Sequence, residues 1–393
     1  MSDKFTKIIA AFAILFLIGI VIAEVMPERE DVPQDDSAVS SVVTPTESEP
    51  ATEQKGQVQQ AENLYYYNAL DATEKEIYTA MYNSILNRSE TELTTKDSEV
   101  VKKIFECVTN DHPEIFYCSS YKIESMQLYG EVVRLKFMPN YHMTEETVRD
   151  CQKKIDTYVR NCIASAPKGS DEYSKIKFVY EYIIDRTEYV PNAQNNQNIC
   201  SVFLNGESVC MGYAKATQYI LTQMGIETTL AYGHVTGGES HSWNLVLADG
   251  EYYYVDTTWG DAGYIRPGAA MNATSGQGIN YEYFMITTQQ ILKTHTIDNV
   301  VPLPACVATR NNYFIREGLY LRSYEEATLA TIFDRMHSEN RKSVAFQCAD
   351  EETYREVLDH LVTQQGVFKF VKGDGSVSYS YNDQLYTLIF WIE

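Results

Sequence analysis

Basic side chains are scarce in this chain of 393 residues. Lysine and arginine together number 32 against 54 aspartates and glutamates, which gives a formal net charge of -22. A field of that sign repels phosphate backbones and anionic lipid headgroups. The composition therefore argues against nucleic-acid binding.

Several motifs with a known chemistry are also missing. The eight cysteines form no C-x-x-C pair and are too sparse for a disulfide scaffold. There is no phosphate loop, dinucleotide fingerprint, EF-hand loop or H-E-x-x-H helix, and no internal repeat of about 20 to 50 residues. We therefore expect no cofactor and no metal site.

Residues 1–23 have the pattern of an export signal or a short membrane anchor. Lys4 and Lys7 precede an apolar run of about 16 residues, which is shorter than the roughly 20 residues of a comfortable spanning helix. Val21 and Ala23 are small enough to allow cleavage, and a buried core helix is the alternative. The signal and the anchor both predict that the rest of the chain is extracytoplasmic, either membrane-anchored or secreted.

The remaining chain divides into a tether and three folded segments. Residues 24–62 are rich in proline, serine, threonine, glutamine and acids and contain almost no aromatics, which predicts a disordered acidic linker. With 44% hydrophobic residues, the rest has enough apolar material for several cores. We expect an N-terminal α/β domain at 63–168, a central domain at 169–300 and a small C-terminal α/β domain at 301–393.

Apolar spacing predicts the elements of these segments. In the first we expect helices at 69–86, 100–108 and 144–164 and strands at 115–125 and 132–138. The central segment opens with a helix at 172–186. In the last we expect strands at 313–320, 343–347 and 386–392 and helices at 325–337 and 352–363.

Cys210 begins a helix that the sequence predicts to run to Met224, with Gly225 as its left-handed stop. The unpaired N–H groups and the positive end of the helix dipole favour a thiolate there, and the same groups could receive an oxyanion. The alternative is one more buried apolar cysteine.

A predicted hairpin brings a histidine to a carboxylate. Asp249-Gly250 is a strong signal for a tight two-residue loop. Pairing across that loop places His241 and Asp256 on one face as diagonal neighbours, roughly 7 to 8 Å apart and within reach of a hydrogen bond. The same face carries apolar side chains that we expect to pack on the helix of Cys210: Trp243, Leu245, Tyr252 and Tyr254.

Cys210, His241 and Asp256 are the residue types that nucleophilic thiol catalysis needs. The blocks that hold them, at 206–214, 241–244 and 255–261, resemble the transglutaminase-like superfamily, and most closely its bacterial exported members. The resemblance covers about 172–261 and, weakly, 283–286. It implies an α+β, papain-like core in which the helix bearing the cysteine packs on an antiparallel sheet.

Further site residues follow from these blocks. Those expected to support the site are Gly212, Tyr213, Trp243, Trp259 and Asp261. The resemblance also implies an oxyanion donor upstream of the cysteine, for which Gln194, Asn195 and Asn198 are candidates. His234 is a weaker candidate base because the hairpin offers it no carboxylate.

Two cysteines lie eleven residues apart on one predicted helix. Cys151 and Cys162 are too far apart to bridge each other. Each could pair with Cys107 or Cys118, and simple burial is the alternative.

These observations predict an extracytoplasmic thiol enzyme that acts on amide bonds of a peptide or protein through a thioester. Peptidase or amidase activity is slightly favoured over protein-glutamine acyl transfer. The alternatives are a cell-surface binding protein with a catalytically silent core, and a spacer with a vestigial one. The expected partners are a peptide or protein substrate, with cell-wall material as one option, and the membrane if the N-terminal segment is retained.

Overall fold

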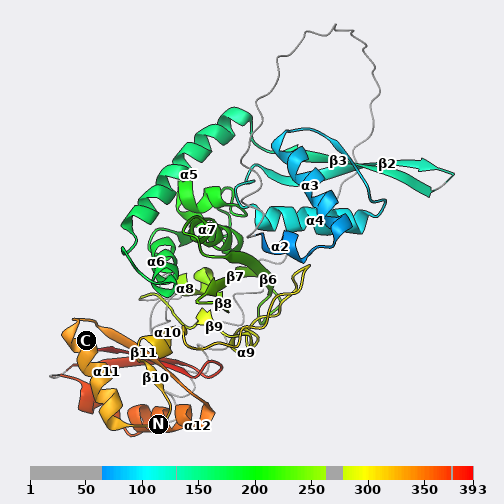
Figure 1. Cartoon of the computed structure of the whole chain (residues 1–393). Coiled ribbons are helices and arrows are strands. Elements are labelled where there is room, and N and C mark those ends of the chain that lie inside the picture. The colour runs from blue at the N-terminus through cyan, green and yellow to red at the C-terminus, as the bar shows by residue number, and fades with distance from the viewer. Residues whose placement is uncertain (1–63, 130, 263–277, 373–374, 393) are drawn as a thin grey trace. The chain divides into compact units, whose positions relative to one another are not determined.

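The computed structural model describes residues 64–129, 131–262, 278–372 and 375–392 (Figure 1). The predicted leader at 1–23 and linker at 24–62 lie outside these ranges. Among the helices within them, none is long and apolar enough to cross a membrane. Leu64–Val235 and Ser240–Glu393 group into one compact unit, and the three domain boundaries stay a prediction.

The N-terminal segment combines helices with a three-stranded antiparallel sheet of order β1-β3-β2. The predicted helices and strands are present with shifted ends. Its elements are α2 (Tyr65–Ala69), α3 (Ala72–Leu86), β1 (Thr91–Leu93), α4 (Ser98–Asp111), β2 (Cys118–Leu128) and β3 (Glu131–Tyr141). Asp71 and Glu74 form a capping box that fixes the start of α3. Ile104 and Phe137 lie in the core that these helices and strands share.

Helix α5 (Glu145–Ser165) follows and begins, as predicted, after Thr144, whose side chain accepts a hydrogen bond from Thr147. Its buried residues Ile155, Val159 and Cys162 belong to the same hydrophobic cluster as the helices of the central segment.

The central segment is built around a four-stranded antiparallel sheet of order β6-β7-β8-β9. Its elements are α6 (Glu172–Ile184), β4 (Glu188–Tyr189), the π-helical turn η2 (Ser201–Asn205), β5 (Glu207–Ser208), α7 (Cys210–Gln223), β6 (Thr228–His234), β7 (Ser240–Ala248), β8 (Glu251–Val255), α8 (Thr257–Asp261) and β9 (Phe284–Ile286). A helix bearing the cysteine therefore packs on an antiparallel sheet, as expected.

The predicted hairpin register is confirmed. Ala248 pairs with Glu251 across a two-residue loop. Asp249 and Gly250 both have positive φ, 51° and 77°, as the type I′ turn of a tight hairpin requires. Strand β8 ends at Val255, the residue before Asp256.

The prediction of which sheet face packs on α7 is wrong. Asn244 donates a hydrogen bond from Nδ2 to the carbonyl of Ala214 in α7, so the opposite face of β7 contacts this helix. That face carries Val246 and Ala248, which share a cluster with α7. Small side chains on both surfaces allow the close approach. The face with Trp243, Leu245 and Tyr254 packs instead against Tyr283, Ile286, Ile291 and Cys306.

The C-terminal segment holds a four-stranded sheet of order β10-β11-β13-β12, with one parallel pair. Its elements, with the α9 and α10 turns that precede it, are α9 (Thr288–Ile291), α10 (Tyr313–Arg316), β10 (Tyr320–Leu321), α11 (Glu326–Ser338), β11 (Ser343–Cys348), α12 (Glu351–Leu358), η3 (Asp359–Thr363), η4 (Gly366–Phe370), β12 (Val377–Asn382) and β13 (Thr387–Ile392). The predicted strand at 313–320 is wrong, because Asn312 accepts hydrogen bonds from Phe314 and Ile315 and starts a helical turn there.

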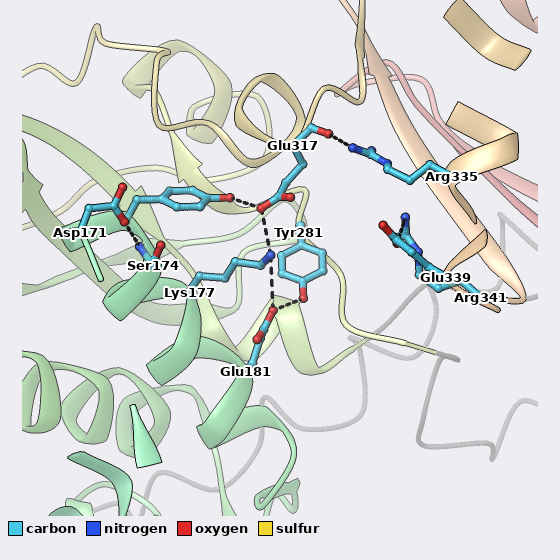
Figure 2. A network of polar contacts seen from close by, with 10 residues as sticks. Asp171, Ser174, Lys177, Glu181, Tyr281, Glu317, Arg335, Glu339 and Arg341 are labelled. Atoms are coloured by element: carbon cyan, nitrogen blue, oxygen red, sulfur yellow. Dashed lines mark hydrogen bonds and ion pairs between the residues drawn. The ribbon is translucent and has the colours of Figure 1, made fainter. Parts of the chain in front are cut away.

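Partly buried polar groups join α6 to the segment around α10 (Figure 2). Lys177 Nζ lies 2.9 Å from Glu317 Oε1 and 3.9 Å from Glu181 Oε1. Tyr281 donates its hydroxyl proton to Glu181 at 2.5 Å, and Arg335 of α11 donates to the carbonyl of Glu317 at 2.7 Å. These bonds fix the chain at Tyr281, which leads into β9.

Candidate active site

Cys210 occupies the first position of α7. The residue before it, Val209, has an extended backbone and no side chain that caps the helix. Because the first amides of a helix have no intrahelical acceptor, the N–H groups of Cys210 and Met211 point out of its N-terminus. The thiol therefore lies where backbone donors and the helix dipole both favour negative charge.

Close packing behind the helix holds the cysteine in place. A Cβ added at Gly212 would come 2.0 Å from Ser208 Oγ and 2.6 Å from Ser201 Oγ, so only glycine fits there without rearrangement. The two serine hydroxyls are hydrogen-bonded at 2.6 Å and fully buried. Val190 donates its N–H to the carbonyl of Ser208 and fixes the chain just before Cys210.

His241 and Asp256 form the predicted hydrogen bond. His241 Nε2 lies 2.7 Å from Asp256 Oδ2. Asp256 is fully buried and is the N-cap residue of α8, where its other oxygen, Oδ1, accepts the N–H of Trp259 at 3.0 Å. The two bonds hold both carboxylate oxygens and orient the imidazole.

Burial and the mutual attraction of His241 and Asp256 shift the pKa values of both side chains. Burial alone would lower the pKa of His241, but attraction to Asp256 and hydrogen bonds to Asp256 and Cys210 raise it to about 10. Burial opposes the ionisation of Asp256. Attraction to the His241 imidazolium is stronger than this effect and holds the pKa of the Asp256 carboxyl well below its usual range. Cys210, His241 and Asp256 are thus in contact as a chain of three groups.

The expected supporting residues surround these groups. The Trp243 ring stacks on His241 at 5.9 Å between centroids, and Trp259 lies at the same distance on a tilted plane. Tyr213 donates its hydroxyl proton to Asp261 at 2.7 Å, which ties α7 to α8. Trp259 and Asp261 both lie in that short helix.

His295 also reaches Asp256, which no pattern in the sequence indicates. Its buried Nε2 lies 3.4 Å from Asp256 Oδ2, while its Nδ1 is hydrogen-bonded to Thr294 Oγ1 at 2.8 Å. The ring also packs at 4.9 Å from Trp243 and 4.6 Å from Trp259. The only available signal was that histidine occurs seven times in the chain, which is too weak to single this one out.

His241, Asp256 and His295 could in principle share a metal ion, because their ligand atoms lie within 4.8 Å of one another. A tetrahedral zinc ion with ligands at about 2.1 Å would hold two ligand atoms roughly 3.4 Å apart. The 2.7 Å between His241 and Asp256 is instead an ordinary hydrogen-bond length. The distances therefore fit a hydrogen-bonded group better than a metal centre.

The oxyanion candidates are not brought to the cysteine by any hydrogen bond described for them. Asn198 uses its side-chain oxygen to accept the N–H of Cys200. Gln194 is exposed, and Asn195 adopts a positive φ of 60° in the same loop. The second oxyanion donor thus stays unassigned.

His234 does have a carboxylate partner, which the sequence did not indicate. Its Nδ1 lies 2.6 Å from Asp298 Oδ2, and both side chains are about half exposed. The pair is a surface contact separate from the cluster around Asp256.

Comparison with known families agrees with the resemblance seen in the sequence. Residues 157–257 match the transglutaminase-like superfamily. The chain therefore carries a transglutaminase-like domain, and this range contains Cys210, His241 and Asp256. No curated protein matches the chain.

Solved structures give weak matches over part of the chain. One, the crystal structure of a TGase, is 14% identical with a TM-score of 0.28, over 47% of this chain and 55% of that one. Another, from Cytophaga hutchinsonii and provisionally described as a cysteine protease, is 12% identical with a TM-score of 0.25, over 35% of this chain and 62% of that one. The chain thus spans less than two thirds of either protein.

Proposed function

We propose that the protein is a thiol enzyme that cleaves amide bonds of peptides or proteins, with Cys210 as nucleophile, His241 as acid and base, and Asp256 as the group that orients the imidazole. The observation that carries the proposal is the contact chain itself. A cysteine at a helix N-terminus touches a buried histidine, which is bonded at 2.7 Å to a buried aspartate.

The reaction follows from these positions. The Cys210 sulfur attacks the carbonyl carbon of the amide, and a C–S bond forms while the oxygen takes the negative charge beside the first amides of α7. The C–N bond then breaks, and the imidazolium of His241 gives its proton to the departing amine. A thioester on Cys210 remains.

In the second half of the reaction, water or an amine cleaves the thioester. His241, now neutral, removes a proton from the incoming group, and the C–S bond breaks to return the thiolate. With water the product is a carboxylic acid, and with an amine it is a new amide. We favour hydrolysis, because the sequence provides no calcium loop of the kind found in animal crosslinking enzymes.

The location and the partner are part of the proposal. The pattern of residues 1–23 supports export, with the membrane reached through that segment if it is retained. A peptide or protein outside the cytoplasm, cell-wall material included, would then be the substrate.

Replacement of Cys210 by alanine tests the nucleophile. We expect Cys210→Ala to abolish both casein cleavage and amine incorporation into casein, whichever the wild type shows, with a loss of roughly 10³-fold or more. Cys348→Ala is the matched control, because Cys348 is buried in β11 of the C-terminal sheet, whereas His241 lies in β7 of the central sheet. Activity that survives in Cys210→Ala would show that the nucleophile is assigned wrongly.

A further inference from the structure

Two cysteines outside the site touch each other. The thiols of Cys151 in α5 and Cys200, the residue before η2, are in hydrogen-bonding contact. All eight cysteines are free thiols and lie within the described residues. Cys107 and Cys118, the partners expected from the sequence, lie in a different hydrophobic cluster from Cys200.

Neighbouring contacts show that this approach belongs to a packed interface. Helix α5 packs along η2, and Tyr158 meets Phe203 at 5.0 Å between ring centroids. Cys151 and Tyr158 are seven residues apart and lie on one helix face, and Cys200 and Phe203 are three apart on the facing turn. The contact between Cys151 and Cys200 and the contact between Tyr158 and Phe203 therefore belong to the same interface between α5 and η2.

We propose that Cys151 and Cys200 form a disulfide bond when the protein meets a disulfide oxidant. Sulfurs in contact need to move by no more than about 2 Å to reach the roughly 2.05 Å of an S–S bond. The inference concerns the fold and does not depend on the proposed catalytic activity.

The chemistry is thiol–disulfide exchange with a small disulfide such as oxidised glutathione. Cys151 is partly exposed, and its sulfur attacks one sulfur of the oxidant, which releases one glutathione thiol and leaves a mixed disulfide. The Cys200 sulfur then attacks the Cys151 sulfur and releases the second glutathione thiol. Two protein thiols are oxidised, one disulfide is reduced, and the two protons leave on the released thiols.

The order of these steps follows from burial. Cys200 is fully buried, and this burial, together with the nearby Cys151 thiol, raises the pKa of Cys200 to about 12. The exposed partner is therefore the one that meets the oxidant first, and the buried one closes the bond from within the protein.

The cross-link would tie α5 to the chain that leads into the nucleophile. Only residues 201–209, which include η2 and the short strand β5, separate Cys200 from Cys210. In that stretch Ser201 and Ser208 already support the start of α7. Oxidation should thus stiffen the segment behind Cys210.

The test uses the full chain with Cys210→Ala, so that the proposed nucleophile forms no mixed disulfide. The protein is incubated with oxidised glutathione, alkylated, digested without reductant and mapped by mass spectrometry. We expect a linked peptide pair containing Cys151 and Cys200, two fewer alkylated thiols, and a Tm higher by roughly 5 to 10 °C than that of the reduced protein.

Two further variants make the result specific. Cys151→Ala should abolish the linked peptide and the oxidant-dependent rise in Tm, whereas Cys162→Ala, on the same helix, should keep both. A glutathione adduct that stays on Cys151 without the link would overturn the inference. So would a linked peptide that joins either residue to a different cysteine.

Discussion

Asp256 uses its two carboxylate oxygens for different tasks. Oδ2 accepts from His241, and Oδ1 caps α8 through the N–H of Trp259. An asparagine can still cap a helix but carries no charge. Asp256→Asn therefore separates the electrostatic role of this residue from its structural one.

We expect Asp256→Asn to lower the pKa of His241 from about 10 to below about 7. The attraction of the carboxylate is lost while burial, which opposes the charged ring, remains. NMR titration of the His241 ring would measure this, and kcat/KM should fall roughly 100-fold or more. Asp298→Asn, next to the exposed His234, is the control and should leave both quantities unchanged.

The same variant should change how stability depends on pH. A histidine whose pKa is raised on folding stabilises the protein below its unfolded value of about 6.5, and this contribution disappears as the pH rises through the folded value. Wild-type unfolding free energy should therefore fall between about pH 6.5 and 10 more steeply than that of Asp256→Asn. Parallel pH profiles in urea unfolding would mean that the ion pair adds nothing to stability.

At the scale of single residues, the sequence predicted the bond between His241 and Asp256 because one turn signal sets a whole register. Asp249-Gly250 fixes the loop length, and the pairing follows from it. His295 could not be predicted in this way, since it lies in irregular chain after α9 and its approach to Asp256 depends on long-range packing.

At the scale of the elements, the start of α7 packs tightly against the buried side chains of Ser201 and Ser208. The Cβ of an alanine at Gly212 would collide with two hydrogen-bonded serines. We expect Gly212→Ala to destabilise the protein by about 2 kcal/mol, as overpacking of a buried contact does, and urea unfolding would measure it.

A double variant shows whether the collision is the cause. Ser208→Ala removes the nearest oxygen, so Gly212→Ala combined with Ser208→Ala should lose less stability than the two single changes added together. Simple additivity would point to another cause.

The positions of helices and strands were predictable where the apolar spacing extends over many residues. They were ambiguous where the apolar segment is short or where both faces of a strand carry apolar residues. The long helix α5 and its Thr144 cap follow from spacing and capping alone. The residues at 313–320 include aromatic and β-branched side chains that are typical of a strand, yet Asn312 caps a helical turn. Both faces of β7 carry apolar residues, Trp243 and Leu245 on one and Val246 and Ala248 on the other, so the sequence could not decide which face α7 covers.

At the scale of the whole molecule, the site depends on chain well beyond the range that matches the superfamily. Residues 157–257 lack the side chains that cover Trp243 and Tyr254, which come from 283–306. Each large side chain left uncovered costs about 1.5 to 3 kcal/mol. The fragment 157–257 should therefore show no cooperative thermal transition in near-UV circular dichroism.

A chain of residues 64–393 is the control, and it should melt cooperatively because it keeps every described contact. If the fragment alone melts cooperatively, the segment at 283–306 is dispensable for the fold. The sequence predicted the core motifs, but it could not show how far the core extends, because its outer layer has no regular period.

The chain has three tryptophans, and two of them, Trp243 and Trp259, lie within 5.9 Å of the His241 ring. The third, Trp391, is buried in β13 and lies in a separate cluster. Intrinsic indole fluorescence therefore comes largely from the immediate surroundings of one imidazole. The protein contains its own optical reporter, through which proton uptake or acylation next to that ring can be followed in real time without an attached dye.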